Sequence, residues 1–457
     1  MKPKPPPLFP FQAQGVAFAE STNFRCLIGD EPGLGKTRQA LECIRRHPDK
    51  LLPAIVVCPP STMRETWAKE ALRVAPDIPV GFIASNSDDM PKRTWKGILI
   101  ISWAMVANFS AKIRAHHFSL LIADEAHLAK NIDNAAWADA LASITDRVKH
   151  AIFLTGTPMV NRTEELHTLL YMLQPKIIPE LEAFEDLADE DPEAFQALLD
   201  RVMIRRLFKE NMPDIPDKTR HFVEVALPPR LKVVYDKAER DWEQWLNDHL
   251  PAIVARQLKF KKVSNRDREA IVEARIRRAL EHEALTKAGR LRQIVGEAKA
   301  IPALNVAQGL LNKQEHVVIF AEHSAVVELI SKEAERRGLR FQVLDGKARS
   351  HEERARLIRA FQSAHGRPMI FICSRAGYVG VTLTRARYVV FAERWWTSVE
   401  DDQAEGRVYR ITQTRPPHMI YMHVPGSIDD KMRTLVEGKR DLIQKLIGAT
   451  DAQKGKA

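Results

Sequence analysis

The fold of this chain is decided by Gly29-Asp30-Glu31-Pro32-Gly33-Leu34-Gly35-Lys36-Thr37, which lies between an apolar run (24–28) and a helix-like segment (39–46). A strand that ends in a glycine-rich turn and leads into a helix presents backbone N–H groups to a phosphate. In such a loop the lysine reaches the outer phosphates and the threonine hydroxyl binds Mg²⁺. We therefore predict a nucleotide site. The residues expected to line it are Gly33, Gly35, Lys36 and Thr37.

The loop departs from the usual pattern at one position. Asp30 stands where the first glycine of G-x-x-x-x-G-K-[ST] is expected. The alternative interpretation is a glycine-rich turn that binds nothing.

Short apolar runs alternate with helix-like segments on either side of this loop. Near-continuous apolar strands between helices are typical of a parallel sheet covered on both faces, so we predict an α/β fold. The expected strands of the first half are 24–28, 54–58, 80–84, 98–102, 120–123 and 151–154.

Polar residues follow two of these strands directly. Asp124-Glu125-Ala126-His127 follows one run, and Thr155-Gly156-Thr157-Pro158 follows another. A carboxylate at a buried strand end is costly without a partner, so we expect Asp124 to hold Mg²⁺ and Glu125 to polarise the attacking water. A capped helix start with two acids remains the alternative for the first group.

Composition limits the choices further. The 457 residues suffice for two or three domains, and a net charge of +10 favours polyanion partners. No apolar run approaches the ~20 residues of a membrane span, and no signal core follows the proline-rich residues 1–7. We expect an intracellular protein, cytoplasmic or in the nucleoid if prokaryotic or viral and nuclear if eukaryotic. The cysteines lack a C-x-x-C pair and are expected to be reduced, packed thiols; they are Cys26, Cys43, Cys58 and Cys373.

The middle of the chain, residues 231–292, is helical in pattern and strongly basic between 256 and 292. An amphipathic helix with a solvated basic face and an arm near the phosphates of a duplex are both open interpretations. A second βα series begins near residue 299. It repeats no phosphate loop, so we expect it to complete the nucleotide site. Its expected strands are 317–320, 341–344, 369–372 and 388–391.

The segment Gln403-Ala404-Glu405-Gly406-Arg407-Val408-Tyr409-Arg410 carries two arginines three residues apart. On a helix they share one face. If that face closes on the first half of the chain, Arg407 and Arg410 meet the γ-phosphate and stabilise charge during phosphoryl transfer. A surface ion-pair helix is the alternative.

These motifs, in this order, resemble those of helicase superfamily II. The sequence of residues 29–40 is most similar to that of the SWI/SNF-related branch, in which Asp is common at the first position of the phosphate loop. Residues 389–396 with Gln403-Ala404-Glu405, and Thr382 where remodelers usually have Asn, resemble its annealing-helicase branch. Tyr409 and Thr412 replace the usual His and Gly. The ordered motifs are Gln12, 30–37, 58–61, 124–127, 154–158 with Asn161, and 403–410.

The resemblance implies two RecA-like lobes, each a mostly parallel sheet flanked by helices, with a helical insertion between them. The boundaries it implies are 1–205 for the first lobe, 206–298 for a basic helical protrusion, 299–427 for the second lobe and 428–457 for a brace helix and tail. It also implies ATP and Mg²⁺ as cofactors, with Gln12 and Gly380 at the nucleotide. The implied DNA contacts are Pro60, Ser61, Ser102, Trp103, Ser374 and Arg375.

We therefore expect a DNA-dependent ATPase that translocates on double-stranded DNA and remodels or reanneals strands. The expected partners are double-stranded or forked DNA, with replication or repair proteins as further candidates. No membrane partner and no histone-reading module are expected, so the chain resembles a bare motor. A strand-separating or RNA-directed helicase and a nucleotide-gated clamp without translocation remain alternatives.

Overall fold

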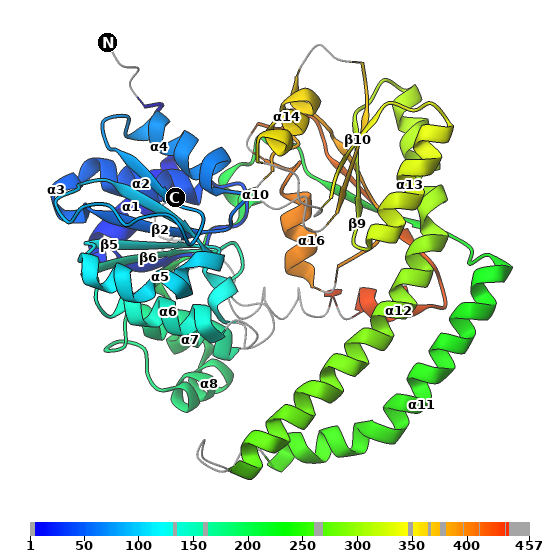
Figure 1. The fold of residues 1–457 in the computed structure, drawn as a ribbon, viewed down its shortest axis with the longest axis horizontal. Helices are drawn as coiled ribbons and strands as arrows, with labels where there is room; N and C mark the ends of the chain where they lie inside the picture. Colours follow the sequence, from blue (N-terminus) through cyan, green and yellow to red (C-terminus); the bar gives the residue numbers. More distant parts are fainter. Residues whose placement is uncertain are drawn as a thin grey trace.

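The structure is a computed structural model with two lobes and a long helical hairpin (Figure 1). Side chains at 130, 135, 245–285, 351–352 and 398–399 are not described. The described residues are 5–130, 135–158, 163–259, 268–345, 351–363, 367–374, 381–395, 397–410, 412–434 and 436–437.

The first lobe is built on a parallel sheet of order β3-β4-β2-β5-β6-β1-β7. All the expected strands of the first half form, and β7 is an addition. The strands are β1 Arg25–Ile28, β2 Ala54–Cys58, β3 Val80–Ile83, β4 Ile98–Ser102, β5 Leu120–Asp124, β6 His150–Leu154 and β7 Met203–Ile204.

Helices cover both faces of this sheet because alternate strand residues are apolar on both sides. Leu27, Leu121 and Phe153 belong to one apolar core, whereas Ile28 and Ile122 belong to the other. The helices are α1 Pro10–Ser21, α2 Lys36–Arg46, α3 Pro48–Leu51, the π-helical η1 Met63–Ala68, α4 Lys69–Val74, α5 Trp103–His116, the 3₁₀ turn η2 Ala126–Lys130, α6 Ala135–Thr145, α7 Thr163–Leu173, α8 Leu181–Glu190, α9 Pro192–Asp200 and α10 Phe208–Asn211.

The second lobe is built on another parallel sheet, of order β10-β11-β9-β12-β13-β8. Two parallel-sheet lobes flanked by helices confirm the predicted fold class. The elements are β8 Thr219–Glu224, β9 Val317–Ala321, α13 Ser324–Arg336, β10 Phe341–Leu344, α14 His351–Gln362, β11 Ile370–Ser374, β12 Tyr388–Phe391, α16 Ser398–Glu405 and β13 His418–His423.

The helical hairpin consists of α11 (Pro229–Lys259) and α12 (Arg268–Asn312), which run side by side away from the sheet (Figure 1). Both of its ends pack in the second lobe, since Tyr235 and Leu291 belong to the same apolar core as β9 and β12. The hairpin is therefore an insertion between β8 and β9 of one sheet.

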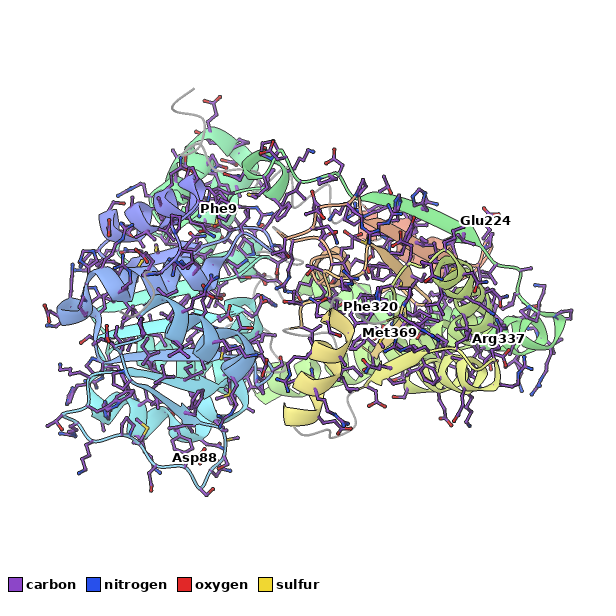
Figure 2. The ribbon with its side chains drawn as sticks, turned by 90° about the horizontal axis from the view of Figure 1, so that it is seen from above. Phe9, Asp88, Glu224, Phe320, Arg337 and Met369 are labelled. Carbon is purple, nitrogen blue, oxygen red and sulfur yellow. The ribbon has the colours of Figure 1, made fainter. Side chains whose placement is uncertain are left out.

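Two features of this arrangement bear on the expected boundaries. Residues 219–224, expected in the protrusion, form a strand paired with β13, and Glu224 lies on the second lobe in Figure 2. The expected boundary at 298/299 falls inside the continuous helix α12. The strand was missed because only Phe222 and Val223 of β8 are apolar and half-buried, so it lacks the signature of a central strand.

The segment expected to be a brace begins with helical residues 428–434. Lys299 of α12 is 2% exposed and pairs with Asp429 at 2.8 Å, so this helix is tied to the base of the hairpin. Residues 438–457 lie outside the described part.

All four cysteines are free and buried, as expected for packed thiols. No helix in the described part of the chain combines the length and the apolar character that crossing a bilayer needs.

Candidate nucleotide-binding site

The polar strand ends meet at one edge of the first sheet. β1 pairs with β6, and β6 pairs with β5, so Gly29, Asp124 and Thr155 follow or end three neighbouring strands. The amide of Thr155 donates to the carbonyl of Ile28 at 3.2 Å. The carboxyl ends of parallel strands thus gather the predicted groups, as the sequence spacing required.

The phosphate loop has the backbone that its glycines allow. Gly33 has φ +98° and Gly35 has φ +77°, both in the left-handed region. A Cβ at Gly35 would lie 2.6 Å from Nε2 of Gln12. Gly35 is the N-cap residue of α2. The N–H groups in the first turn of a helix have no partner within that helix, so those of α2 are available to a phosphate held by the loop.

Lys36 and Thr37 lie on the first turn of α2, and both are half-buried. Nζ of Lys36 donates to the carbonyl of Asp30 at 2.6 Å. Burial lowers the pKa of Lys36, while the carboxylates of Glu125 and Asp124 oppose that shift. The ammonium group therefore sits between the loop and the acids of β5, where an outer phosphate would be neutralised.

Asp124, only 8% exposed, ends β5. Its Oδ2 accepts from Nε1 of Trp67 at 2.8 Å, and Nε1 of Trp103 donates to its carbonyl at 2.9 Å. Burial and the neighbouring Glu125 raise the pKa of Asp124 to about 7. A buried carboxyl group of this kind is stabilised in its charged form by a nearby cation, and Mg²⁺ would serve as one.

Glu125 has a strained backbone, with φ +52°. Its Oε2 is buried without a hydrogen-bond partner among the described residues and lies 3.4 Å from Nδ1 of His127. His127 in turn contacts Oγ1 of Thr155 at 2.9 Å. The imidazole of His127 therefore links the carboxylate of Glu125 to the hydroxyl of Thr155, which follows β6.

The raised pKa of Asp124 predicts a pH-dependent metal requirement. Protons compete with Mg²⁺ for this carboxylate as the pH falls below about 7. The Mg²⁺ concentration for half-maximal ATP hydrolysis should rise roughly tenfold from pH 8 to pH 6. Trp67→Phe removes a bond that favours the charged form and should enlarge the rise, whereas Trp95→Phe should not. An identical Mg²⁺ dependence at both pH values would contradict the assignment.

Gln12 lies at the site, 5% exposed. Its Nε2 donates to the carbonyl of Leu34 at 3.2 Å, and its Oε1 accepts from the amide of Phe9 at 3.2 Å. In this structure Gln12 therefore braces the phosphate loop, and its contact with adenine stays a prediction.

Asp30 is fully buried and paired with Arg206, which is also fully buried. Nε of Arg206 donates to Oδ1 of Asp30 at 2.8 Å, and Nη2 of Arg206 donates to Oε1 of Gln39 at 2.8 Å. Gln39 donates to Oδ2 of Asp30 at 2.9 Å. Arg206 also donates to the carbonyl of Phe11. The acid in the glycine position thus fastens the loop to α1, to α2 and to the chain after β7.

Sequence reasoning missed two arginines of this region. Arg206 could have been inferred, because a buried aspartate requires a cationic partner. Arg205, 7% exposed, donates to the carbonyl of Gly29 at 3.1 Å and that of Gly156 at 3.4 Å. It joins the phosphate loop to the third strand end.

Arg407 and Arg410 do not share a helix face, which corrects the prediction. Helix α16 ends at Glu405, and residues 406–410 form a turn. Nε of Arg410 donates to the carbonyl of Gly406 at 2.8 Å, and Nη1 donates to Oγ1 of Thr382 at 2.8 Å. Burial, with Arg407 nearby, lowers the pKa of Arg410 to about 9, so the group remains charged at neutral pH.

This arginine turn, residues 406–410, contacts the phosphate loop. A Cβ at Gly406 would lie 3.2 Å from Cβ of Pro32, and a Cβ at Gly33 would lie 3.6 Å from the carbonyl oxygen of Tyr409. The rings of Phe208 and Tyr409 pack with centroids 4.6 Å apart. The two lobes therefore meet at the predicted site.

The expected DNA contacts divide into two groups. Pro60 is exposed and Ser61 is half-exposed, so both are accessible to a DNA strand. Ser102 and Trp103 are 3% and 1% exposed, so their side chains lie within the lobe, and the indole of Trp103 donates to the carbonyl of Asp124.

In the second lobe Ser374 is 5% exposed and its Oγ lacks a hydrogen-bond partner in the described part. Arg292, expected among the basic arm residues, is 6% exposed and pairs with Glu322, so it is structural. The side chains of the basic residues from 256 to 285 lie outside the described part, as do Arg375, Gly380 and Asn161.

The donor set fits a nucleotide with Mg²⁺. Two left-handed glycines leave a cradle with no Cβ atoms, and Oε2 of Glu125 and Oγ1 of Thr157 are buried without partners among the described residues. Lys36, Thr37 and Asp124 would hold the phosphates and the metal.

A parallel-sheet lobe with a phosphate loop, facing a second such lobe with an arginine turn, defines the two-lobed RecA-like class. The SNF2-related domain matches residues 11–299, and the helicase conserved C-terminal domain matches residues 299–412. The chain belongs to the SNF2-related family, which confirms the predicted SWI/SNF-related identity.

Curated relatives agree. The chain is 28% identical over 98% of its length to the SWI/SNF-related matrix-associated actin-dependent regulator of chromatin subfamily A-like protein 1 of Drosophila melanogaster, covering 57% of it. It is 26% identical over 94% of its length to the human DNA annealing helicase and endonuclease ZRANB3, covering 40%. The second relative is named a DNA annealing helicase, which agrees with the predicted branch. The chain spans about half of their length.

The solved Sulfolobus solfataricus SWI2/SNF2 ATPase core in complex with dsDNA aligns over 99% of this chain and 96% of that chain. The two are 23% identical, with a TM-score of 0.45.

Proposed function

We propose that this protein is an ATP-dependent double-stranded DNA translocase that couples hydrolysis to strand remodelling or reannealing. The observation that carries this proposal is the contact between the phosphate loop and the arginine turn. A site shared by two lobes links nucleotide state to lobe position, which is what a translocase requires.

Bound ATP with Mg²⁺ supplies the phosphoryl group and the divalent charge that polarises it. Lys36 and the N–H groups of α2 bind and orient the phosphates. Glu125 takes a proton from the attacking water, and its strained backbone fixes where the carboxylate points. Arg407 and Arg410 approach from the second lobe and offset negative charge on the outer phosphate.

The response of the lobes to hydrolysis has a candidate route in the first lobe. His127 joins Glu125 to Thr155, and Arg205 joins Gly29 to Gly156. A change at the outer phosphate would therefore shift the third strand end and the chain that leaves β7. That chain continues into Phe208, which packs on Tyr409 of the second lobe.

Duplex or forked DNA is the proposed substrate, with replication or repair proteins as candidate partners. A human relative is named a DNA annealing helicase, which supports this choice. Pro60 and Ser61 after β2 are the accessible candidates for backbone contact. Residues 1–205 and 299–427 are proposed as the two lobes, extended by β8, with the hairpin as a protrusion of the second.

The test compares ATP hydrolysis with duplex DNA, single-stranded DNA and duplex RNA, and then measures displacement of a third strand from a triplex. We expect the duplex to stimulate hydrolysis most, at least tenfold, and triplex displacement to require ATP. Preferential stimulation by single strands or RNA would favour the strand-separating or RNA-directed alternative. Turnover without displacement would favour a nucleotide-gated clamp. Either result would refute translocation on double-stranded DNA.

A further inference from the structure

A cavity lies at the amino-end edge of the second sheet, opposite the strand ends that carry Ser374 and Glu393. Its volume is about 380 Å³. It lies near Met369, which is labelled in Figure 2 and immediately precedes β11. The residues that line this amino-edge pocket are Gln314, Glu315, His316, Pro368, Arg385 and Arg415.

Two arginines line the pocket, Arg385 and Arg415, and the carboxylate of Glu315 holds Arg415 together with the neighbouring Arg387. Oε1 of Glu315, a side chain 12% exposed, accepts from Nη2 of Arg387 at 2.8 Å and from Nη1 of Arg415 at 3.1 Å. One acid thus orients two arginines. Arg385 and Arg340 add positive charge close enough to act on His316. Cations outnumber the acid, so the pocket attracts anions.

His316 is the one aromatic ring among the residues that line the pocket. It is 7% exposed, and its Nδ1 is buried without a hydrogen-bond partner among the described residues. Its ring packs edge-on against Phe361, with centroids 5.4 Å apart, so the imidazole is fixed at the pocket wall. His316 therefore contributes a fixed polar ring to the wall of the pocket.

The chemistry favours phosphate. Guanidinium groups bind phosphate oxygens in pairs, and several cations around a polar ring nitrogen match a group with three or more acceptor oxygens. The volume is at the lower end of the roughly 300–1,000 Å³ range of small-molecule pockets. One or two phosphate groups would fit such a space better than a large organic cofactor.

We propose that the amino-edge pocket is a second phosphate-binding site, separate from the nucleotide site. The phosphate group belongs either to a DNA strand or to a small free polyphosphate, and the DNA source rests on the proposed function. Arg415 and Arg385 would contact the phosphate, and Glu315 would position Arg415.

The test of binding is calorimetric titration with inorganic pyrophosphate. It uses the full chain with Lys36→Ala, so that the phosphate loop does not contribute. Adding Arg415→Gln should weaken pyrophosphate binding about tenfold, equal to ~1.4 kcal/mol. Arg336→Gln removes one exposed charge on α13 and should change nothing. Arg385→Gln is a second variant of a residue proposed to contact the phosphate. Thermal melting of each variant shows whether a loss of binding comes from a folding defect. No pyrophosphate binding, or equal binding with and without Arg415, would overturn the proposal.

The source of the phosphate is decided by fluorescence anisotropy with a labelled duplex at several salt concentrations. If the site takes a DNA phosphate, Arg415→Gln weakens binding and lowers the salt slope by about one. If only pyrophosphate binding falls, the ligand is a small polyphosphate. Failure of the proposed function is separate, since it would appear as absent duplex-stimulated hydrolysis in the protein with Arg415 intact.

Discussion

Replacing Arg410 with alanine is expected to lower duplex-stimulated ATP hydrolysis about a thousandfold. The guanidinium belongs to the arginine turn that contacts the phosphate loop, and it is fixed by the carbonyl of Gly406 and the hydroxyl of Thr382. With its pKa near 9, it is charged at pH 7 and acts in a partly dry site. Both features increase the stabilisation that a positive group gives to charge on a transferring phosphoryl group.

The measurement is kcat with saturating duplex, together with binding of a fluorescent ATP analogue. Arg410→Ala should retain nucleotide binding within a few-fold, whereas Lys36→Ala should lose both binding and hydrolysis. Arg336→Ala, an exposed arginine of α13, serves as the matched control. Retention of duplex-stimulated hydrolysis by both Lys36→Ala and Arg410→Ala would refute the assignment of the site.

Replacing Arg206 with methionine is expected to lower the free energy of unfolding of the first lobe by about 3–5 kcal/mol. The side chain pairs with Asp30, and neither side chain has exposed surface. Methionine fills most of the volume but leaves a buried carboxylate without its cation. Arg206 also donates to Gln39 and to the carbonyl of Phe11, so two further acceptors lose a donor.

Urea denaturation of the full chain measures this effect, with the exposed Arg201 replaced by methionine as the control. Asp30→Asn in the Arg206→Met background should recover part of the loss, because the two sites are coupled. Asp30→Gly restores the usual loop pattern. It should nevertheless lower the free energy of unfolding, because it leaves the buried Arg206 without its carboxylate partner. A loss below 1 kcal/mol for Arg206→Met would show that the pair is dispensable.

The central strands were predictable because β2, β4, β5, β6 and β9 are buried throughout and are mostly apolar in sequence. The order of polar strand ends likewise placed Asp124 beside the loop. Edge strand β8 gave no such signal, because its residues are exposed or half-buried.

The partners of the site were less accessible to sequence reasoning. Trp67 and Arg206 lie 57 and 176 residues away from the aspartates they contact, and no local pattern encodes such pairs. The arginine spacing was read as helical, but α16 stops at Glu405, and the turn that follows is stabilised by bonds from Arg410 and Gln413 to the segment 381–386. Tertiary contacts, not spacing, determine that geometry.

The insertion of the hairpin within the second sheet has a mechanical consequence. Because α11 and α12 both pack against the second lobe, we expect the hairpin to move with that lobe as one rigid unit. At 1.5 Å per residue, the 31 residues of α11 span about 45 Å. A lobe rotation of roughly 10° would then sweep the far end of the hairpin through roughly 8 Å. A small closure around a nucleotide is thereby magnified into a stroke longer than the rise of two base pairs.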